Sequence, residues 1–192
     1  MSAHQDLLMI HEIRLYGDPV LRKPAVRVTE FDQRLQQLAE DLLATQDQVG
    51  AVGLAAVQIG SNWNVFSVDG THVQRRGRRE VLTNPEIVDQ DGEIFDEEGC
   101  LSFPGVFVRI ARPHWVALRA HDLRGKEIER EAEGFLARAY MHEIDHLQGR
   151  LFVDRMDPDT RAKVVGMMQS IAGKRSPDRR VFPLAPGRDG RP

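Results

Sequence analysis

The sequence predicts an α+β fold in which short, mostly antiparallel sheets pack around one central helix, with another helix near the C-terminus. Short runs rich in β-branched and aromatic residues follow one another between residues 64 and 132. Helical periodicity is confined to three segments, and the strands and helices do not alternate strictly along the chain. Segregated strands and helices favour α+β over a parallel α/β fold.

The N-terminal part is expected to hold an extended segment and one helix. Residues 13–28 are expected to be extended, with a short turn or helix opening at Asp18 and Pro19. Asp32 can cap the first helix, because a side-chain oxygen at this position accepts hydrogen bonds from first-turn N–H groups, and Gly50 ends it. The inner face of this helix is expected to carry Leu35, Leu38, Leu42 and Val49.

Short strands are expected to form the middle of the chain. The first covers residues 64–69, and residues 70–80 then form a polar loop whose arginines we interpret as solvated. The segment Asp122-Leu123-Arg124-Gly125 predicts the turn of a hairpin between two runs of strand-forming residues. The remaining strands are expected at residues 81–82, 86–88, 93–95, 106–110, 115–120 and 126–132.

Two helices are expected in the C-terminal part. The first ends at Gly149, since glycine readily adopts the left-handed conformation that closes a helix. The second begins with Asp157 as its cap and Pro158 at its first position, and ends at Gly173. The apolar stripe of the first is Phe135, Leu136, Ala139, Tyr140, Ile144 and Leu147, and the buried side of the second is Val164, Val165, Met168 and Ile171.

Length and composition fit one domain with a tail. The 192 residues, 41% of them hydrophobic, suffice for a single core, which we expect to span residues 1–173. Residues 174–192 are rich in Pro, Gly and Arg and are expected to be disordered, because they lack apolar residues that could pack. No internal repeat is visible.

Several classes of protein are excluded by composition. A net charge of −3 argues against a nucleic-acid-binding surface, and no apolar run approaches the roughly 20 residues of a membrane helix. The N-terminal residues lack the basic-then-apolar order of a signal peptide. The lone Cys100 cannot form an internal disulfide, which fits a reducing compartment. We therefore expect a cytoplasmic protein.

The segment from His142 to His146 predicts metal chemistry. It reads H-E-x-x-H, and residues at positions i and i+4 of a helix lie on the same face, with Cβ atoms roughly 5–6 Å apart. Two imidazoles at this spacing can bind one metal ion, with Glu143 beside a water molecule that the ion holds. The motif predicts hydrolysis by a metal-bound hydroxide, with Glu143 as general base and then general acid. A solvated histidine pair is the alternative.

The third ligand of such a site is not supplied by a downstream histidine or glutamate. Phe152 stands where the metzincin pattern has its third histidine, and neither residue type occurs after His146. Asp154 and Asp157 remain downstream. Upstream, Cys100 is a candidate, because a thiolate with two imidazoles suits zinc or ferrous iron. A lone cysteine is otherwise most often a small buried hydrophobe.

Three segments together resemble the peptide deformylase family. Residues 51–58, A-V-G-L-A-A-V-Q, are similar to the family's G-x-G-L-A-A-x-Q. Residues 98–102 match E-G-C-L-S in full, and residues 142–147 match the core of Q-H-E-x-D-H-L. Order and spacing agree as well, and the resemblance covers roughly residues 10 to 170. Three motifs in one chain are far more specific than any one of them.

Two positions depart from the family pattern. Ala51 replaces the first glycine of the first motif, where glycine can imply a positive φ or a close backbone approach. Met141 replaces the glutamine before His142 and cannot donate its hydrogen bond, so the surroundings of the metal ligands can differ. Both departures are interpreted as tuning of activity.

The resemblance implies a metal-dependent amide hydrolase that removes the formyl group from the N-terminal formylmethionine of nascent polypeptides and releases formate. It implies Cys100, His142 and His146 as ligands of one divalent ion, ferrous in the cell, with zinc, nickel or cobalt able to occupy the site. The side-chain amide of Gln58 and the backbone N–H of Leu101 would stabilise the oxyanion.

The resemblance also implies how the substrate binds. The peptide would add as an extra strand, and an apolar pocket would take the methionine. The residues expected to bind it are Val52, Gly53, Gly105, Val106, Phe135 and Ala139. Glu98 and Arg112 are expected to pair and brace the cysteine segment. The tail carries six Lys/Arg and two Asp, so transient contact with the anionic ribosome is a further hypothesis.

Two alternatives stay open at this point. The first is a zinc peptidase with Asp154 as the third ligand. The second is a catalytically silent, metal-stabilised binding module descended from a deformylase. The presence of both Glu143 and Gln58 argues against the second, since a structural metal site needs neither.

Overall fold

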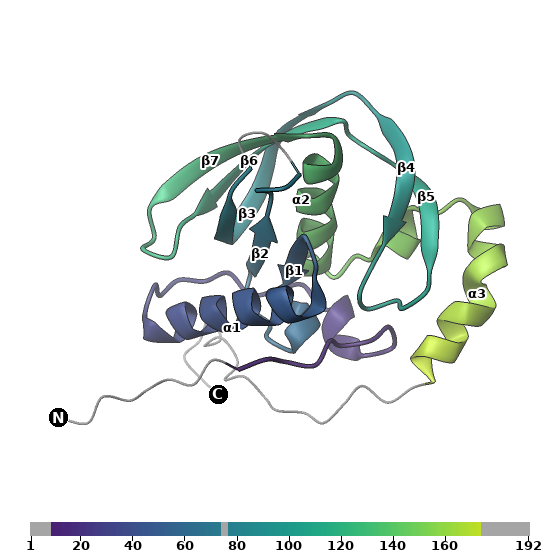
Figure 1. The fold of residues 1–192 in the computed structure, drawn as a ribbon, viewed down its shortest axis with the longest axis horizontal. Coiled ribbons are helices and arrows are strands. Elements are labelled where there is room, and N and C mark those ends of the chain that lie inside the picture. The colour runs from purple at the N-terminus through teal and green to yellow at the C-terminus, as the bar shows by residue number, and fades with distance from the viewer. Residues whose placement is uncertain (1–8, 74–76, 174–192) are drawn as a thin grey trace.

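The computed structural model describes residues 9–73 and 77–173, and its architecture is α+β, as predicted. A five-stranded antiparallel sheet has the order β1-β2-β3-β6-β7, and β4 pairs with β5 in a separate two-stranded sheet. Figure 1 shows helix α2 between the larger sheet and the β4–β5 hairpin. The expected tail, residues 174–192, lies outside the described residues.

The elements have the following bounds. The strands are β1 (Gly53–Ala55), β2 (Val65–Asp69), β3 (Arg79–Asp91), β4 (Ile94–Gly99), β5 (Phe107–Arg112), β6 (Trp115–His121) and β7 (Glu127–Glu133). The helices are α1 (Gln33–Val49), α2 (Gly134–Leu147) and α3 (Pro158–Ala172), and the short 3-10 helices are η1 (Pro19–Arg22), η2 (Ala56–Ile59) and η3 (Phe152–Arg155).

Helix α1 begins and ends where the sequence predicts. The carboxylate of Asp32 accepts hydrogen bonds from the backbone N–H groups of Arg34 and Leu35 at 3.0 and 3.2 Å. Gly50 closes the helix with φ +66°, a conformation that costs glycine little. Leu35, Leu38 and Leu42 are buried, whereas Val49 is only half-buried.

Helices α1 and α2 pack on opposite faces of the larger sheet. Successive strand residues point to opposite faces, so Val65 joins the core around α1 while Phe66 joins the core around α2. Leu136, Ile144 and Leu147 bury the inner side of α2. Burying such a side chain contributes about 1.5–3 kcal/mol, so core packing holds α2 in place without a bound ligand.

One expectation about the strands was wrong: residues 81–82 and 86–88 belong to a single strand, β3. The register shifts between Thr83 and Glu86, where Asn84 adopts φ +52° and is followed by Pro85. The side chain of Asn84 donates to the carbonyl of Val28 at 2.9 Å and accepts from its N–H at 2.8 Å. This long-range pairing stabilises an irregularity that the sequence alone suggests is a break.

Helix α3 is confirmed with its cap, but not with its whole buried side. Asp157 accepts from the backbone N–H of Thr160 at 2.9 Å, and Met168 and Ile171 are buried. Val165, expected to be buried, is 43% exposed, because α3 lies at the edge of the molecule (Figure 1). Among the described residues, no helix has the length and apolar character to cross a membrane.

Candidate metal centre

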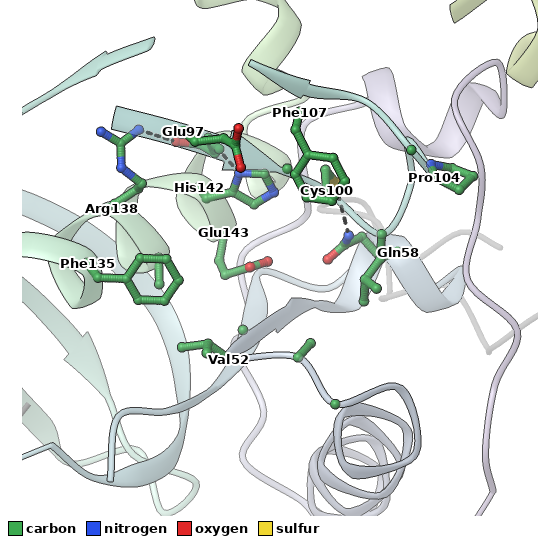
Figure 2. Close-up of a pocket in the computed structure, with 18 residues that line it drawn as sticks. Val52, Gln58, Glu97, Cys100, Pro104, Phe107, Phe135, Arg138, His142 and Glu143 are labelled. Atoms are coloured by element: carbon green, nitrogen blue, oxygen red, sulfur yellow. Dashed lines mark hydrogen bonds and ion pairs between the residues drawn. The ribbon is translucent and has the colours of Figure 1, made fainter. Parts of the chain in front are cut away.

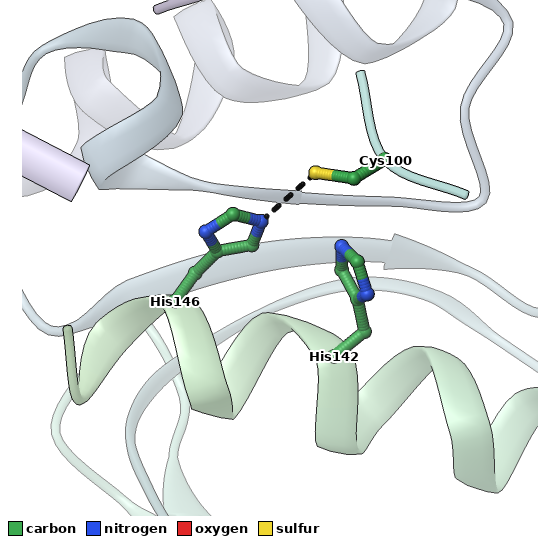
Figure 3. A group of neighbouring side chains, drawn as sticks. All are labelled: Cys100, His142 and His146. Carbon is green, nitrogen blue, oxygen red and sulfur yellow. Dashed lines mark hydrogen bonds between the residues drawn. The ribbon is translucent and has the colours of Figure 1, made fainter. Parts of the chain in front are cut away.

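The side chain of Cys100 lies beside His142 and His146, which share one face of α2. The ligand atoms of the three residues lie within 4.8 Å of one another, and Cys100 Sγ is 3.2 Å from His146 Nε2 (Figure 3). The two histidines come from adjacent turns of α2, and Cys100 directly follows β4. A thiolate and two imidazoles within this distance form a donor set suited to zinc or ferrous iron.

Glu98 orients the first imidazole. Its Oε1 lies 2.6 Å from His142 Nδ1. Burial raises the pKa of the Glu98 carboxyl, but hydrogen bonds from His142 and Arg112 outweigh it, so the pKa lies far below its usual range. An ionised carboxylate can only accept, so Nδ1 of His142 carries a proton, and Nε2 is the nitrogen left to bind a metal ion. A carboxylate behind a metal-binding imidazole fixes the orientation of the ring in this way.

Buried arginines hold Glu98 in turn. Arg112 donates to both oxygens of Glu98, at 2.6 and 3.0 Å, so the expected pairing of these two residues is confirmed. Arg112 also donates to Asp145 on α2 at 2.5 Å, and Arg155 binds the same carboxylate at 2.7 and 2.8 Å. A chain of charge-assisted hydrogen bonds therefore joins the β4–β5 hairpin to α2.

Gln58 extends its amide toward the same centre. Its Oε1 accepts from the backbone N–H of Ala55 at 2.9 Å, which assigns the opposite end of the amide to nitrogen. That Nε2 lies 3.6 Å from Cys100 Sγ (Figure 2). It also lies 3.3 Å from Ser102 Oγ. Ser102 was not predicted as a contact of Gln58, although its place in the matched segment 98–102 was a signal.

Glu143 is a buried carboxylate without a hydrogen-bond partner at Oε2 in the described part of the chain. Burial is the main cause that raises its pKa to about 7, and the charge of Glu98 acts in the same direction. A carboxyl group with a pKa near neutral can both accept and donate a proton. An orphaned buried oxygen beside a Cys/His/His cluster also fits a site that accommodates an ion with its water.

The cluster opens into a cavity of about 550 Å³. Figure 2 shows Glu143, His142 and Cys100 on one side of it and Val52 on the other. The predicted site residues on its wall are Val52, Gly53, Gln58, Cys100, Leu101, Gly105, Phe135, Ala139, His142 and Glu143. The cavity therefore collects most of the predicted site, from segments far apart in sequence.

Three predicted positions need correction or comment. Val106, expected to bind the peptide through its main chain, is not on the cavity wall and its side chain packs in the core, so its role in binding stays a prediction. Phe135, expected in the buried stripe of α2, is 54% exposed at the cavity wall. Asp154, the alternative third ligand, instead pairs with Arg22 at 2.5 Å and lies outside the Cys/His/His group.

Sequence reasoning missed several residues on the cavity wall. Among them are Glu97, Pro104, Phe107 and Arg138. Phe107 lies across Gly99: a Cβ built on Gly99 would meet its ring at 2.5 Å. No local pattern distinguishes these residues from ordinary strand and helix positions, so their place follows only from the packing of the hairpin against α2.

The two departures from the family motifs are accommodated without strain. Ala51 lies outside the left-handed region, and the amide of Gln46 donates to its carbonyl at 3.1 Å. Met141 is buried in the core around α2. Neither position therefore distorts the segment that carries it.

Comparisons with known proteins agree with this geometry. The model of the polypeptide deformylase family matches residues 10–162. Peptide deformylase of Thermodesulfovibrio yellowstonii is 44% identical over 151 residues, which cover 79% of this chain and 92% of the relative. The Clostridium botulinum enzyme is 47% identical over 148 residues, covering 77% and 97%.

A solved structure is similar over most of its length. The peptide deformylase of Legionella pneumophila superposes with a TM-score of 0.78 at 39% identity, covering 84% of this chain and 95% of that one. The match includes the segments that bring Cys100 and the two histidines together. The chain is therefore a member of the polypeptide deformylase family.

Proposed function

We propose that this enzyme hydrolyses the formyl group from the N-terminal formylmethionine of nascent polypeptides and releases formate. Membership of the family supports removal of the formyl group. The observation that carries the proposal is that Glu143 and Gln58 line one cavity together with Cys100 and His142 of the Cys/His/His cluster. The expected compartment is the cytoplasm, since the substrate is a nascent chain.

Cys100, His142 and His146 would hold one divalent ion, ferrous iron in the cell, with zinc, nickel or cobalt able to replace it. When bound, the ion supplies a Lewis acid that lowers the pKa of water toward neutrality. Metal analysis and activity after anaerobic purification test the ferrous assignment. An enzyme active only with zinc, and stable in air, would contradict it.

Glu143 would move the proton. With a pKa near 7, its carboxylate takes the proton from the attacking water, and the same group then gives it to the departing amine. The C–N bond of the formamide breaks, the water oxygen stays on the carbon as formate, and the peptide leaves with a free amino group. No other reactant is needed.

Gln58 would stabilise the charge that develops on the carbonyl oxygen. The Ala55 N–H holds Oε1, so the amide presents Nε2 to the cluster, where it can donate to an oxyanion. The backbone N–H of Leu101 is proposed as the second donor, from the segment directly after Cys100. Fixed donors require little reorganisation when the charge appears.

The cavity would bind the peptide as an extended strand. Strand β1 is an edge of the larger sheet, and β4 pairs with β5 on one side; both line the cavity. A peptide between these edges can bond through its main chain, so side chains after the first residue can vary. Val52, Phe135 and Ala139 would contact the methionine side chain.

Formate release from formyl-Met-Ala-Ser tests the function. The parent should turn over, and Glu143→Ala should lower kcat by about 10²–10⁴-fold, the usual contribution of a general acid–base group. Glu129→Ala is the control, because Glu129 is exposed on β7 away from the cavity. No turnover by the parent in its iron, nickel or cobalt form would refute the proposal.

Replacing Cys100 with serine tests the ligand set. Loss of bound metal from this variant supports the deformylase site. Retention of metal would instead favour a peptidase site with Asp154 as a ligand, which its pairing with Arg22 argues against.

A further inference from the structure

Arg138 is a buried cation that none of the matched sequence segments contains. It lies on α2 one turn before His142, and its side chain is 4% exposed. Residues at i and i+4 share a helix face, so Arg138 lies on the side of α2 that carries the histidines. It also lines the cavity and is visible there in Figure 2.

The guanidinium of Arg138 makes three contacts with the β4–β5 hairpin. Nη1 donates to Glu98 Oε2 at 2.9 Å. Nη2 donates to the backbone carbonyls of Ile94 at 3.0 Å and Ile110 at 3.2 Å. One side chain thus holds a carboxylate and both strands of the hairpin, a use that the planar fork of arginine allows and lysine does not reproduce.

These contacts matter because β4 and β5 form a sheet of their own. In the described part of the chain, the two strands pair with each other and with no strand of the larger sheet. The hydrogen bonds of Glu98 to Arg112 lie within the hairpin, whereas those to Arg138 and His142 cross to α2. Arg138 is therefore one of the polar groups that hold the hairpin against the helix, with His142 and the Arg112–Asp145 pair.

The candidate metal ligands come from both sides of the contact between the hairpin and α2. Cys100 follows the hairpin strand β4, and both histidines belong to α2. Glu98 Oε1 accepts from His142 Nδ1 at 2.6 Å, while Arg138 and Arg112 hold the other oxygen at 2.9 and 3.0 Å. Rotation of the Glu98 carboxylate would therefore turn the His142 ring.

We propose that Arg138 is a positioning residue of the metal centre: it fixes the distance between Cys100 and the histidine pair and, through Glu98, the orientation of His142. The inference rests on the metal site of the proposed function. It predicts that removal of the guanidinium loosens the ligand geometry even though Arg138 touches no ligand atom. Weaker metal binding is the primary expected effect, and lower turnover follows from it.

Cobalt binding to Arg138→Met tests this. Methionine keeps an unbranched side chain about as long as the aliphatic part of arginine but removes all three hydrogen bonds. Chelator competition should give a cobalt dissociation constant about 10–100-fold higher, the usual effect of losing a group that orients a ligand, and the cobalt–thiolate absorption bands should shift. Arg119→Met, which changes a half-exposed arginine on β6, should match the parent.

The remaining outcomes decide the inference. A folded Arg138→Met with the parent's dissociation constant and spectrum would overturn it, since only a structural role would remain. If Arg138→Met does not fold, Arg138→Lys decides in its place: weaker cobalt binding supports the inference and parental binding overturns it. A parent that binds cobalt but releases no formate would refute the proposed function alone, and a parent that binds no cobalt would refute both.

Discussion

Gly53 allows strand β1 to lie against the carboxylate that the reaction would use. A Cβ at this position would lie 2.6 Å from Oε1 of Glu143 and 2.9 Å from its Cγ, closer than real side-chain contacts allow. Gly53→Ala should therefore displace Glu143 and lower kcat by about 10²-fold, the scale of a misplacement of about 1 Å. Formate release measures this, with bound cobalt expected to stay at the parent's level.

Gly166→Ala provides the control for that variant, because a Cβ on Gly166 in α3 meets nothing within 4 Å. It should leave kcat unchanged. A Gly53→Ala enzyme as active as the parent would show that Glu143 can move aside without loss, and that its position is not critical.

The candidate site was predictable from the sequence where its residues are local. His142 and His146 are spaced for one helix face with Glu143 between them in sequence, and the matched segments led to Cys100 and Gln58. The contacts of Arg138 with Glu98 and of Gln58 with Ser102 span 40 and 44 residues. Such pairs depend on how elements pack, and no periodic pattern encodes them.

Among the elements, helices with strong end signals were predicted best. Asp32 and Gly50 bound α1, and Asp157 begins α3, because caps act through neighbouring backbone groups. Strand β3 was predicted as two pieces, since its irregularity is held by Val28, 56 residues from Asn84. The prediction overestimated how much of α3 is buried. An apolar stripe in the sequence does not show which other elements pack against it.

The ion pair between Arg22 on η1 and Asp154 on η3 predicts a pH dependence of stability. Burial raises the pKa of the Asp154 carboxyl, but hydrogen bonds from Arg22 and the Leu151 N–H outweigh it and hold the pKa below its usual range. A depressed folded-state pKa contributes stability above the unfolded-state pKa of about 4, and this is lost as pH falls through the folded value.

Asp154→Asn should accordingly lower the free energy of unfolding at pH 7 by about 0.5–1 kcal/mol, a value kept small because the pair is partly exposed. The difference from the parent should shrink as the pH is lowered from about 5 toward 3. Urea denaturation at several pH values measures it. A difference that is the same at every pH would mean that the charge of Asp154 contributes nothing.

For the whole molecule, the uneven charge of the sequence suggests an electrostatic partner. Residues 174–192 carry six Lys/Arg and two Asp in a chain whose net charge is −3. We propose that this segment favours transient contact with the anionic ribosome. A chain ending at Gly173 should co-sediment with ribosomes less than the full chain at low salt, and added salt should remove the difference, because it screens exposed charges. Equal co-sedimentation at low salt would exclude this role.

Metal removal should also affect the stability of the whole molecule. One candidate ligand lies in the β4–β5 hairpin and the other two lie on α2, so a bound ion would link the hairpin to the helix. An ion that binds only the folded chain stabilises it by about 2.7 kcal/mol at 100 times its dissociation constant. At about 2–4 °C per kcal/mol for a chain of this size, stripping the metal should lower Tm by roughly 5–10 °C, as measured by calorimetry with and without a chelator. Cys100→Ser should unfold at one temperature in both conditions. A parent Tm that does not respond to the chelator would mean that a bound ion adds no stability to the contact between the hairpin and the helix.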